Sequence, residues 1–239
     1  LLKKPGKLIR PALVFIGSML LGLKEDFVDL AAAVELLHVS SLIHDDIIDN
    51  SETRRGTQSV HAKYGKNQAL LAGDALIANA IKLAAPYGSN VVSYLSSAAM
   101  AMCAGEALEL EIKIKDLKQY MQIAKLKTAT LIGASLGVAG VYAGNALAGK
   151  LGEIGINTGI AFQIRDDVFD YLEGEKDNSH SNIIDVLYSK SGSISKAVER
   201  AITLNNTSIN KANALASKIP NNKLLKVYLE SIKLPKELH

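Results

Sequence analysis

Long apolar, helix-compatible runs separated by short polar segments dominate the chain, which indicates an all-α protein. No stretch alternates apolar and polar residues as a half-buried strand does. Turn signals fall at Pro5-Gly6, Gly22, Arg55-Gly56-Thr57, Pro86-Tyr87-Gly88, Gly174 and Ser191-Gly192. Helices are predicted near Leu8–Leu21, Asp26–Asn50, Asn67–Ala85, Asn90–Lys113, Leu117–Ala143 and Ala148–Tyr171, with several shorter ones to Leu229. One helical domain spanning residues 1–239 is expected, with long central helices around a cavity.

The uncharged stretch Thr128 to Gly149 is about as long as a membrane span. It is rich in Ala, Gly and other small residues, which makes insertion into a bilayer weak. Its GxxxG pairs, Gly133/Gly137 and Gly140/Gly144, permit close helix packing in soluble bundles as well as in membranes. A buried core helix is therefore predicted here, and no transmembrane segment is expected.

Composition narrows the class of protein. Hydrophobic residues make up 48% of the 239 residues, while aromatic residues make up 5%, which favours helices packed through Ala, Leu, Ile and Gly. The net charge of +3 is small and its charges are interspersed, so no nucleic-acid partner is implied. The single cysteine, Cys103, excludes a disulfide within the chain and is predicted to be a buried structural thiol. No secretory signal pattern opens the sequence, and a cytoplasmic protein is expected.

An acidic cluster, Asp45, Asp46 and Asp49, lies in the segment HVSSLIHDDIIDNSETRRG from His38 to Gly56. The apolar run before it places these carboxylates at a helix C-terminus, where the helix dipole disfavours negative charge. Asp45 and Asp49 also share one helix face. At about 5 Å and an effective dielectric near 20, two such charges repel by roughly 3 kcal/mol. A cation is needed to stabilise this cluster.

A second cluster repeats the pattern in AFQIRDDVFD. Gln163, Asp166, Asp167 and Asp170 are spaced to lie along one helical stripe. Two facing DDxxD clusters would hold Mg²⁺, which prefers a few carboxylates together with water and substrate phosphates. A solvated acidic helix end is the alternative for either copy alone, but two copies that each close an apolar helix favour a diphosphate site.

Basic residues accompany both clusters. Lys7 and Arg10 lie three apart at a helix start, and Arg54 and Arg55 follow the first aspartate cluster. Each one alone is typical of a solvated surface charge. Together they offer what a second diphosphate needs without metal, with arginine forks for bidentate contacts and lysine as a point charge.

The ordered motifs GKLIRP, ELLHVSSLIHDDIID, RRG, LLAGDAL, LKTATL and AFQIRDDVFD resemble those of the trans-isoprenyl diphosphate synthases, the polyprenyl synthetase family. The resemblance extends from about Lys4 to Glu173. It implies an isoprenoid-synthase-type bundle around a central cavity. It also implies a homodimer that condenses isopentenyl diphosphate with an allylic diphosphate through Mg²⁺-dependent ionisation, condensation and elimination.

The resemblance also assigns roles to residues. Isopentenyl diphosphate would be bound without metal by Lys7, Arg10, His38 and Arg55. Mg²⁺ would be bound by Asp45, Asp49 and Asp166, assisted by Asp46 and Asp170. The allylic diphosphate would be held by Arg54, Lys127, Thr128, Gln163 and Lys176. The Lys127 carbonyl or the Thr128 hydroxyl would also stabilise the carbocation, and the released pyrophosphate would accept the proton.

Two departures from the family pattern are visible. Family members carry a helix before the opening motif and a longer segment around Glu111 to Asp116, so we expect residues to be missing from this sequence. Small side chains at Ser40 and Ser41, where short-chain members carry Phe or Tyr, predict products of geranylgeranyl length or longer. Leu37, Val34 and Ile81 are candidates for a deeper floor.

Three other functions stay open. A class I terpene cyclase also uses a DDxxD cluster with Mg²⁺, although its second metal motif is normally of the Asn/Asp-Ser/Thr-Glu type. A non-catalytic subunit of a heteromeric prenyltransferase is a second alternative. The third is a di-iron bundle, for which Glu35 to His38 supplies one E-x-x-H match and Asp177 to His180 only a poor second.

Overall fold

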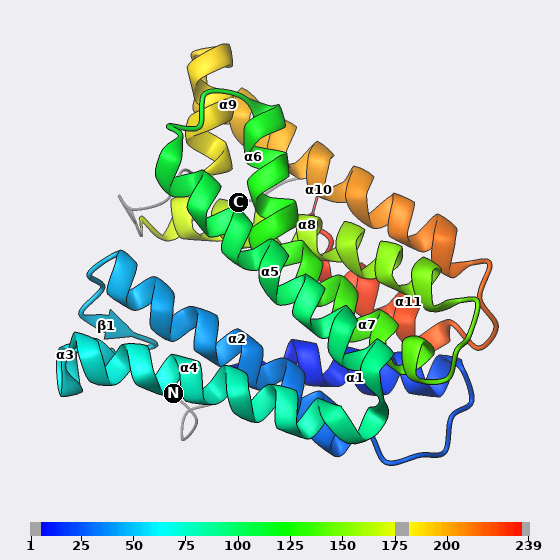
Figure 1. Ribbon diagram of the computed structural model, residues 1–239. Coiled ribbons are helices and arrows are strands. Elements are labelled where there is room, and N and C mark those ends of the chain that lie inside the picture. Colours follow the sequence, from blue (N-terminus) through cyan, green and yellow to red (C-terminus); the bar gives the residue numbers. More distant parts are fainter. Residues whose placement is uncertain (1–5, 175–181, 236–239) are drawn as a thin grey trace.

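Helices form most of the chain in the computed structural model, which describes residues 6–174 and 182–235 (Figure 1). In chain order the elements are α1 (Ile9–Leu20), α2 (Val28–Ile48), β1 (Thr53–Arg54), β2 (Thr57–Gln58), α3 (Val60–Tyr64), α4 (Lys66–Ala84), the 3₁₀ turn η1 (Ala85–Tyr87), α5 (Ser89–Glu111), α6 (Leu117–Ala124), the π turn η2 (Lys125–Ala129), α7 (Thr130–Tyr142), α8 (Ala148–Glu173), α9 (Ile183–Ser191), α10 (Ile194–Ala216) and α11 (Lys223–Ile232). The predicted all-α class is confirmed.

Helix α7 lies at the centre of the bundle, packed against α1, α5 and α8 (Figure 1). Every residue from 131 to 140 is buried, which the absence of charge in this stretch permits. The prediction of a core helix here is confirmed. Glycines bring α7 and α8 into backbone contact, since a Cβ placed on Gly155 would lie 2.6 Å from the Cα of Gly133. Close backbone packing replaces large side chains in this core.

The Gly155→Ala substitution should therefore destabilise the protein. An added Cβ forces α7 and α8 apart, and overpacking of this kind costs about 1–3 kcal/mol. Gly149→Ala, at the start of the same helix, is the matched control, because nothing lies within 4 Å of a Cβ there. Urea denaturation should show a lower midpoint for Gly155→Ala and an equal or higher midpoint for Gly149→Ala. Equal midpoints for the two variants would contradict this packing account.

The expected helix Leu117–Ala143 is interrupted in the structure. It divides into α6, the π turn η2 and α7. A π turn widens the helix locally and is frequent at functional sites, where it redirects side chains. The helical pattern of apolar residues continues through the π turn, so the sequence gives no sign of the interruption. The turn includes Lys127 and Thr128, two of the predicted site residues.

The predicted absence of strands is wrong at one place. Thr53–Arg54 and Thr57–Gln58 form an antiparallel hairpin whose two-residue strands are too short to show alternation. Its loop, Arg55-Gly56, has positive φ at both residues (53° and 69°), as type I′ hairpin turns require. Arg55 thus adopts a left-handed conformation that is costly for a residue with a Cβ.

The region after Gly174 also differs from expectation. Helix α10 has 23 residues, although only shorter helices were predicted there. Its Asn- and Ser-rich sequence hid a packed face that includes Asn205, which is fully buried. The Asn205 amide donates to the Ala161 carbonyl (2.8 Å), and its oxygen accepts from the Leu234 backbone N–H (2.9 Å). These bonds satisfy a polar side chain in the core and join α10 to α8 and the segment after α11.

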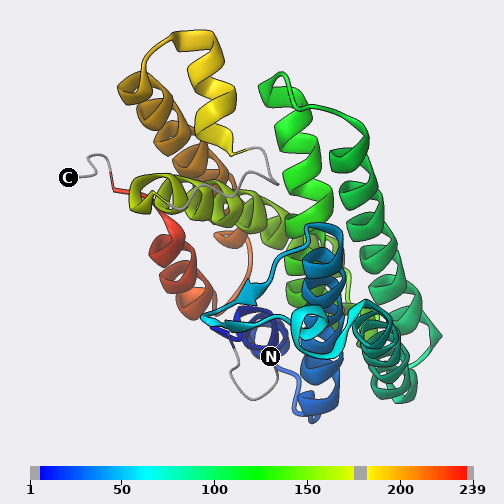
Figure 2. The same ribbon diagram turned by 90° about the vertical axis from the view of Figure 1, so that its left-hand side faces the viewer.

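Two stretches within the described residues, Lys66–Tyr87 and Ser89–Glu111, are long and apolar enough to cross a membrane by length and composition alone. Only 22% and 28% of their respective apolar windows are buried. Core helices of soluble proteins can have the same composition, so these helices are weak grounds for a membrane span. They lie along one side of the bundle, with α10 and α11 on the other (Figure 2).

Candidate active site

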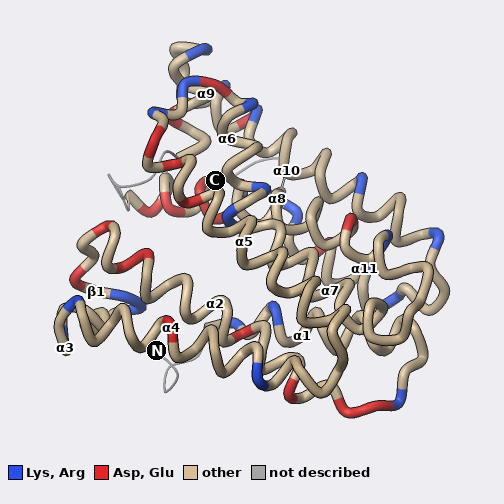
Figure 3. Tube along the Cα trace, in the orientation of Figure 1, with Lys and Arg blue, Asp and Glu red and all other residues tan. Residues whose placement is uncertain are grey.

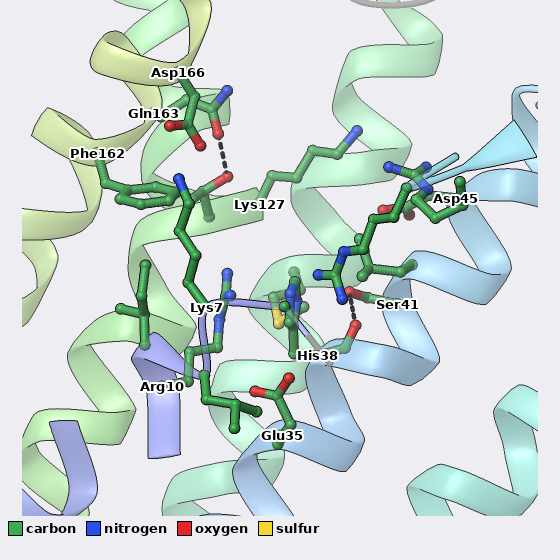
Figure 4. A pocket seen from close by; sticks show the side chains of 18 residues that line it. Lys7, Arg10, Glu35, His38, Ser41, Asp45, Lys127, Phe162, Gln163 and Asp166 are labelled. Carbon is green, nitrogen blue, oxygen red and sulfur yellow. Dashed lines mark hydrogen bonds between the residues drawn. The ribbon is translucent and has the colours of Figure 1, made fainter. Parts of the chain in front are cut away.

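A cavity of about 720 Å³ opens between α1, α2, α8 and the π turn η2 (Figure 4). Most of the predicted site residues line it, drawn from segments far apart in the sequence. These are Lys7, Arg10, His38, Asp45, Arg54, Arg55, Lys127, Thr128, Gln163 and Asp166. Asp46, Asp49 and Asp170 do not line it, and Lys176 lies outside the described residues.

One face of α2 forms a wall of this cavity. Glu35, His38, Leu42 and Asp45 recur at helical spacing and all line it. His38 lies below Asp45 on the same face of α2. Acidic residues gather where the ends of α2 and α8 face each other, as Figure 3 shows. The cavity therefore has an acidic upper end.

The first two aspartates of the first DDxxD motif point in different directions and make different contacts. Asp45 lines the cavity, whereas Asp46 is fully buried and turned toward Arg54. The Arg54 Nε donates to Asp46 Oδ1 (2.7 Å), and its Nη2 pairs with the same oxygen. Asp46 thus anchors the β1–β2 hairpin to the end of α2 and does not line the cavity.

The second motif shows the same division. Asp166 lines the cavity, and Asp167 is buried. Asp167 Oδ2 accepts from the Tyr120 hydroxyl (2.8 Å) and the Ile183 N–H (2.9 Å), and its Oδ1 accepts from the Gln163 amide (2.7 Å). The buried aspartate therefore joins α8 to α6 and α9. In both motifs the first aspartate faces the cavity, and the second fixes the elements around it.

The carboxyl groups that face the cavity are crowded. Burial raises the pKa of Asp45 to about 7, and the neighbouring Glu106 and Asp49 add to the rise while Lys127 opposes it. Burial raises the pKa of Asp166 to about 6, with Lys7 opposing and Asp170 adding to the rise. Raised pKa values mean that the ionised carboxylates lack sufficient positive charge nearby. A bound cation would supply that charge.

The donor set fits Mg²⁺. Asp45 and Asp166 present hard carboxylate oxygens from opposite walls, and Asp49 and Asp170 stand one turn further along their helices. Among the residues that the structure describes, no three His, Cys, Asp or Glu side chains gather into one metal site. Mg²⁺ is usually held by one or two carboxylates plus substrate phosphates and water. This arrangement therefore suits cations that arrive with a diphosphate.

The lower end of the cavity is basic. Burial lowers the pKa of Arg10 to about 10, and Glu35 opposes that shift, so this arginine keeps its charge at neutral pH. Burial lowers the pKa of His38 to about 2, and Arg10 and Arg55 lower it further, so its imidazole is neutral. A Cβ on Gly6 would lie 2.6 Å from Arg55 Nη2, so this guanidinium packs directly against the opening loop. Two arginines and a neutral imidazole form a site for an anion.

Two glutamates outside the predicted set of site residues lie beside Lys127. Its ammonium nitrogen pairs with Glu106 Oε2 at 2.6 Å and with Glu109 Oε2 at 2.7 Å. Both glutamates belong to α5, three residues apart. Acidic residues at the end of an otherwise apolar helix, here Glu106, Glu109 and Glu111, were the signal available to find them, and a similar signal marked the DDxxD motifs.

A hydrogen-bonded chain crosses the cavity wall between η2 and α8. The Thr128 hydroxyl donates to Gln163 Oε1 (2.7 Å), and the Gln163 amide in turn donates to Asp167 (2.7 Å). Figure 4 shows Gln163 beside Asp166. The predicted allylic-site residues on these two elements are thus brought together.

Apolar space continues beneath Asp45. A cavity of about 330 Å³ shares Ser41, Asp45, Met102 and Lys127 with the polar one. A further cavity of about 230 Å³ shares Leu37, Ile77 and Ala99 with the second. Together they form a path between α2, α4 and α5 that leads away from the charged groups.

Cys103 lines this path and is exposed, so the prediction of a buried structural thiol is wrong. The two serines of α2 also differ. Ser41 borders both the polar and the apolar cavity, whereas Ser40 is buried and donates to the Gly73 carbonyl of α4 (3.0 Å). Both serines line the apolar cavity, but of the two Ser41 is the one that also lines the polar cavity.

Comparison with known proteins gives a consistent result. A family model described as polyprenyl synthetase matches residues 1–232. The geranylfarnesyl diphosphate synthase of Aeropyrum pernix is 37% identical over 193 residues, which cover 74% of this chain and 61% of that protein. The geranylfarnesyl diphosphate synthase of Methanosarcina mazei is 35% identical, over 82% of this chain and 70% of its own length.

Solved structures agree. The geranylgeranyl pyrophosphate synthetase from the archaeon Geoglobus acetivorans matches with a TM-score of 0.85 and 27% identity, over 97% of this chain and 88% of that one. In the sequence comparison, the chain spans only about 61% of the length of the Aeropyrum relative.

Proposed function

Because the chain belongs to the polyprenyl synthetase family, we propose that it condenses isopentenyl diphosphate with an allylic diphosphate to form a longer prenyl diphosphate. One observation carries this proposal. The cavity has an acidic end formed by Asp45 and Asp166, a basic end formed by Arg10 and Arg55, and an apolar extension beneath. Two diphosphates and a hydrocarbon tail are the ligands that such a cavity would hold.

Magnesium ions held by Asp45, Asp49, Asp166 and Asp170 would neutralise the charge on the departing pyrophosphate. Asp46 acts one step removed, by fixing Arg54 at the cavity. Lys127 and Arg54 add positive charge on the same side, which stabilises the leaving group as the allylic C–O bond breaks.

The carbocation formed in this way is attacked by the double bond of isopentenyl diphosphate, and a new C–C bond results. Loss of a proton to the released pyrophosphate then forms the new allylic double bond. The Thr128 hydroxyl oxygen and the Lys127 carbonyl place dipoles beside this reaction, and Phe162 helps to exclude water. Holding both substrates in one cavity supplies much of the remaining rate enhancement.

Isopentenyl diphosphate would bind at the basic end without metal. Arg10 and Arg55 supply bidentate contacts, Lys7 supplies a point charge, and neutral His38 supplies one N–H donor. The left-handed backbone of Arg55 supports this role, since strained conformations cluster at functional sites.

Products of geranylgeranyl length or longer are supported in two ways. The apolar cavities continue beyond Ser41 with no aromatic side chain among the residues that line them. Relatives with 35–37% identity are named geranylfarnesyl diphosphate synthases. Each further CH₂ buried in such space gains about 0.8 kcal/mol.

The other functions are less well supported. A terpene cyclase or a non-catalytic subunit would not need both an intact second DDxxD motif and the basic pocket around Arg10. The di-iron alternative requires a second E-x-x-H pair, and the Asp177 to His180 segment lies outside the described residues. A cytoplasmic location remains a prediction.

Binding measurements test the two-site proposal without relying on turnover. Isothermal titration should detect isopentenyl diphosphate binding in the presence of EDTA, whereas the allylic diphosphate should need Mg²⁺. Arg55→Ala should weaken isopentenyl diphosphate tenfold or more, because a charge-assisted hydrogen bond contributes about 1.5–3 kcal/mol. Arg200→Ala, exposed on α10, is the charge-matched control. A metal requirement shared by both ligands, or equal effects of the two variants, would refute the division.

A homodimer is also proposed. The sequence favours the small-residue helix Ser93 to Ala107 for close packing between copies, and this stretch belongs to α5. Large apolar side chains are exposed on α4 and α5, with Leu71 at 67% and Met100 at 73%. Their position on one side of the bundle would let a second copy cover them (Figure 2).

Sedimentation at micromolar concentration should show a dimer, and Met100→Glu should shift it toward monomer, because a charge would be buried in an apolar interface. Val227→Glu is the matched control, since this valine is 62% exposed and belongs to α11, a helix on the other side of the bundle. A monomeric parent protein, or equal dissociation in both variants, would disprove this interface.

A further inference from the structure

The ammonium group of Lys127 is held by two carboxylates of α5. It lies 2.6 Å from Glu106 Oε2 and 2.7 Å from Glu109 Oε2, and the side chains of both glutamates are only 13% exposed. Residues three apart on a helix share one face, so the two glutamates form a pair directed at the lysine. A surface ion pair would contribute little, but these three groups are largely removed from water.

Backbone packing fixes the position of this cluster. Gly105 precedes Glu106, and a Cβ at Gly105 would lie 2.7 Å from the backbone nitrogen of Lys127. Helix α5 can therefore approach the π turn η2 closely only because glycine stands there. The π turn carries Lys127, so its ammonium and the two carboxylates belong to elements in direct backbone contact.

Lys127 is one of the residues assigned to the allylic diphosphate, and its ammonium is already paired with two carboxylates. In the absence of divalent cations, a diphosphate must compete with these carboxylates for the same ammonium. Glu106 lines the apolar cavity together with Lys127, so the diphosphate must also approach a carboxylate at that wall.

We propose that Glu106 and Glu109 are positioning residues that hold Lys127 against α5 and thereby make binding of the allylic diphosphate depend on divalent cations. The proposal rests on the proposed function, since it concerns the diphosphate site of the same reaction. Both glutamates would act in two opposite ways, depending on whether divalent cations are present. They weaken diphosphate binding when cations are absent, and they favour the reaction when cations are present by keeping the lysine in one place.

The test measures binding of inorganic pyrophosphate to the full chain in EDTA, by isothermal titration. Glu106→Gln and Glu109→Gln should each bind pyrophosphate about tenfold more tightly than the parent protein, which corresponds to about 1.4 kcal/mol. Glu111→Gln is the matched control, because it removes the same charge from an exposed position of the same helix. It should bind as the parent does.

The same substitutions made in a Lys127→Ala protein separate the role of Lys127 from a general effect of removing negative charge. In Lys127→Ala, the gain from Glu106→Gln should vanish, because no ammonium remains to be released. With Mg²⁺, both glutamine variants should lower kcat about tenfold while the KM for isopentenyl diphosphate is unchanged, and Glu109→Asp should restore part of the loss. Circular dichroism confirms that each variant is folded.

Pyrophosphate binding that is unchanged or weaker in both folded glutamine variants would overturn the proposal. So would an equal gain in Glu111→Gln, or a gain that persists without Lys127. These binding measurements do not require catalytic turnover. A parent protein that forms no prenyl products would count against the proposed function, whereas the metal-free binding would still decide the role of the glutamates.

Discussion

Replacing Asp45 or Asp166 with alanine should lower the condensation rate by at least about 10²- to 10³-fold, while leaving the helical fold intact. These two carboxylates face each other across the cavity from α2 and α8, and their raised pKa values indicate a need for positive charge (Figure 4). Removing either one would reduce stabilisation of the departing pyrophosphate, and the loss of one such interaction typically costs this factor in rate. Steady-state kinetics with saturating Mg²⁺ and circular dichroism together check both parts.

Two further variants serve as controls. Glu153→Ala removes an exposed carboxylate from α8 and should leave the rate unchanged. Asp167→Ala should act differently, by lowering stability, because it leaves the Tyr120 hydroxyl and the Ile183 N–H without their buried acceptor. Near-normal rates in Asp45→Ala or Asp166→Ala would show that the metal assignment is wrong.

Ser41→Phe should shorten the products to farnesyl length or below. Ser41 borders both the polar cavity and the first apolar cavity of about 330 Å³, so an aromatic ring there would block the path of the growing chain. Mass analysis of dephosphorylated products should show the shift with the overall condensation rate largely kept.

Ser195→Phe, exposed on α10, is the control for an added ring and should leave product length unchanged. Ser40→Phe is a poorer test, because Ser40 is buried against the Gly73 carbonyl and a ring there would displace α4. An unchanged product range in Ser41→Phe, or a parent protein that already stops at farnesyl, would place the floor of the cavity elsewhere.

Much of the fold followed from sequence patterns that depend on local physics. Apolar runs located α1, α2, α4, α5 and α8 to within a few residues, because long amphipathic or buried helices leave a strong signal. The five-residue helix α3 was not predicted. The uncharged small-residue stretch was predicted as a core helix, and α7 is buried as expected. The full length of helix α10 was not predicted, because its buried Asn205 forms its hydrogen bonds with partners on distant segments.

The candidate site was predicted in part for the same reason. The first aspartate of each motif and the basic residues around Arg10 line the cavity, as the resemblance implied. Helical spacing alone could not tell that Asp46 and Asp167 are turned inward, because their orientation depends on Arg54 and Tyr120, which come from other elements.

The role of Glu106 and Glu109 likewise depends on contacts between segments that lie far apart in the sequence. Their importance comes from the contact of α5 with the π turn, and neither the contact nor the turn has a signature in the apolar pattern. The exposed position of Cys103 has a similar cause, since it depends on which face of α5 remains uncovered.

Incubation with isopentenyl diphosphate and a geranyl or farnesyl primer, followed by mass analysis of the products, tests the central claim most directly. With Mg²⁺, the account predicts prenyl diphosphates extended from the primer by whole isoprene units, reaching geranylgeranyl length or more, and none in EDTA. Cyclic hydrocarbons formed from the primer without isopentenyl incorporation, or no product at all from the folded chain with Mg²⁺, would contradict it.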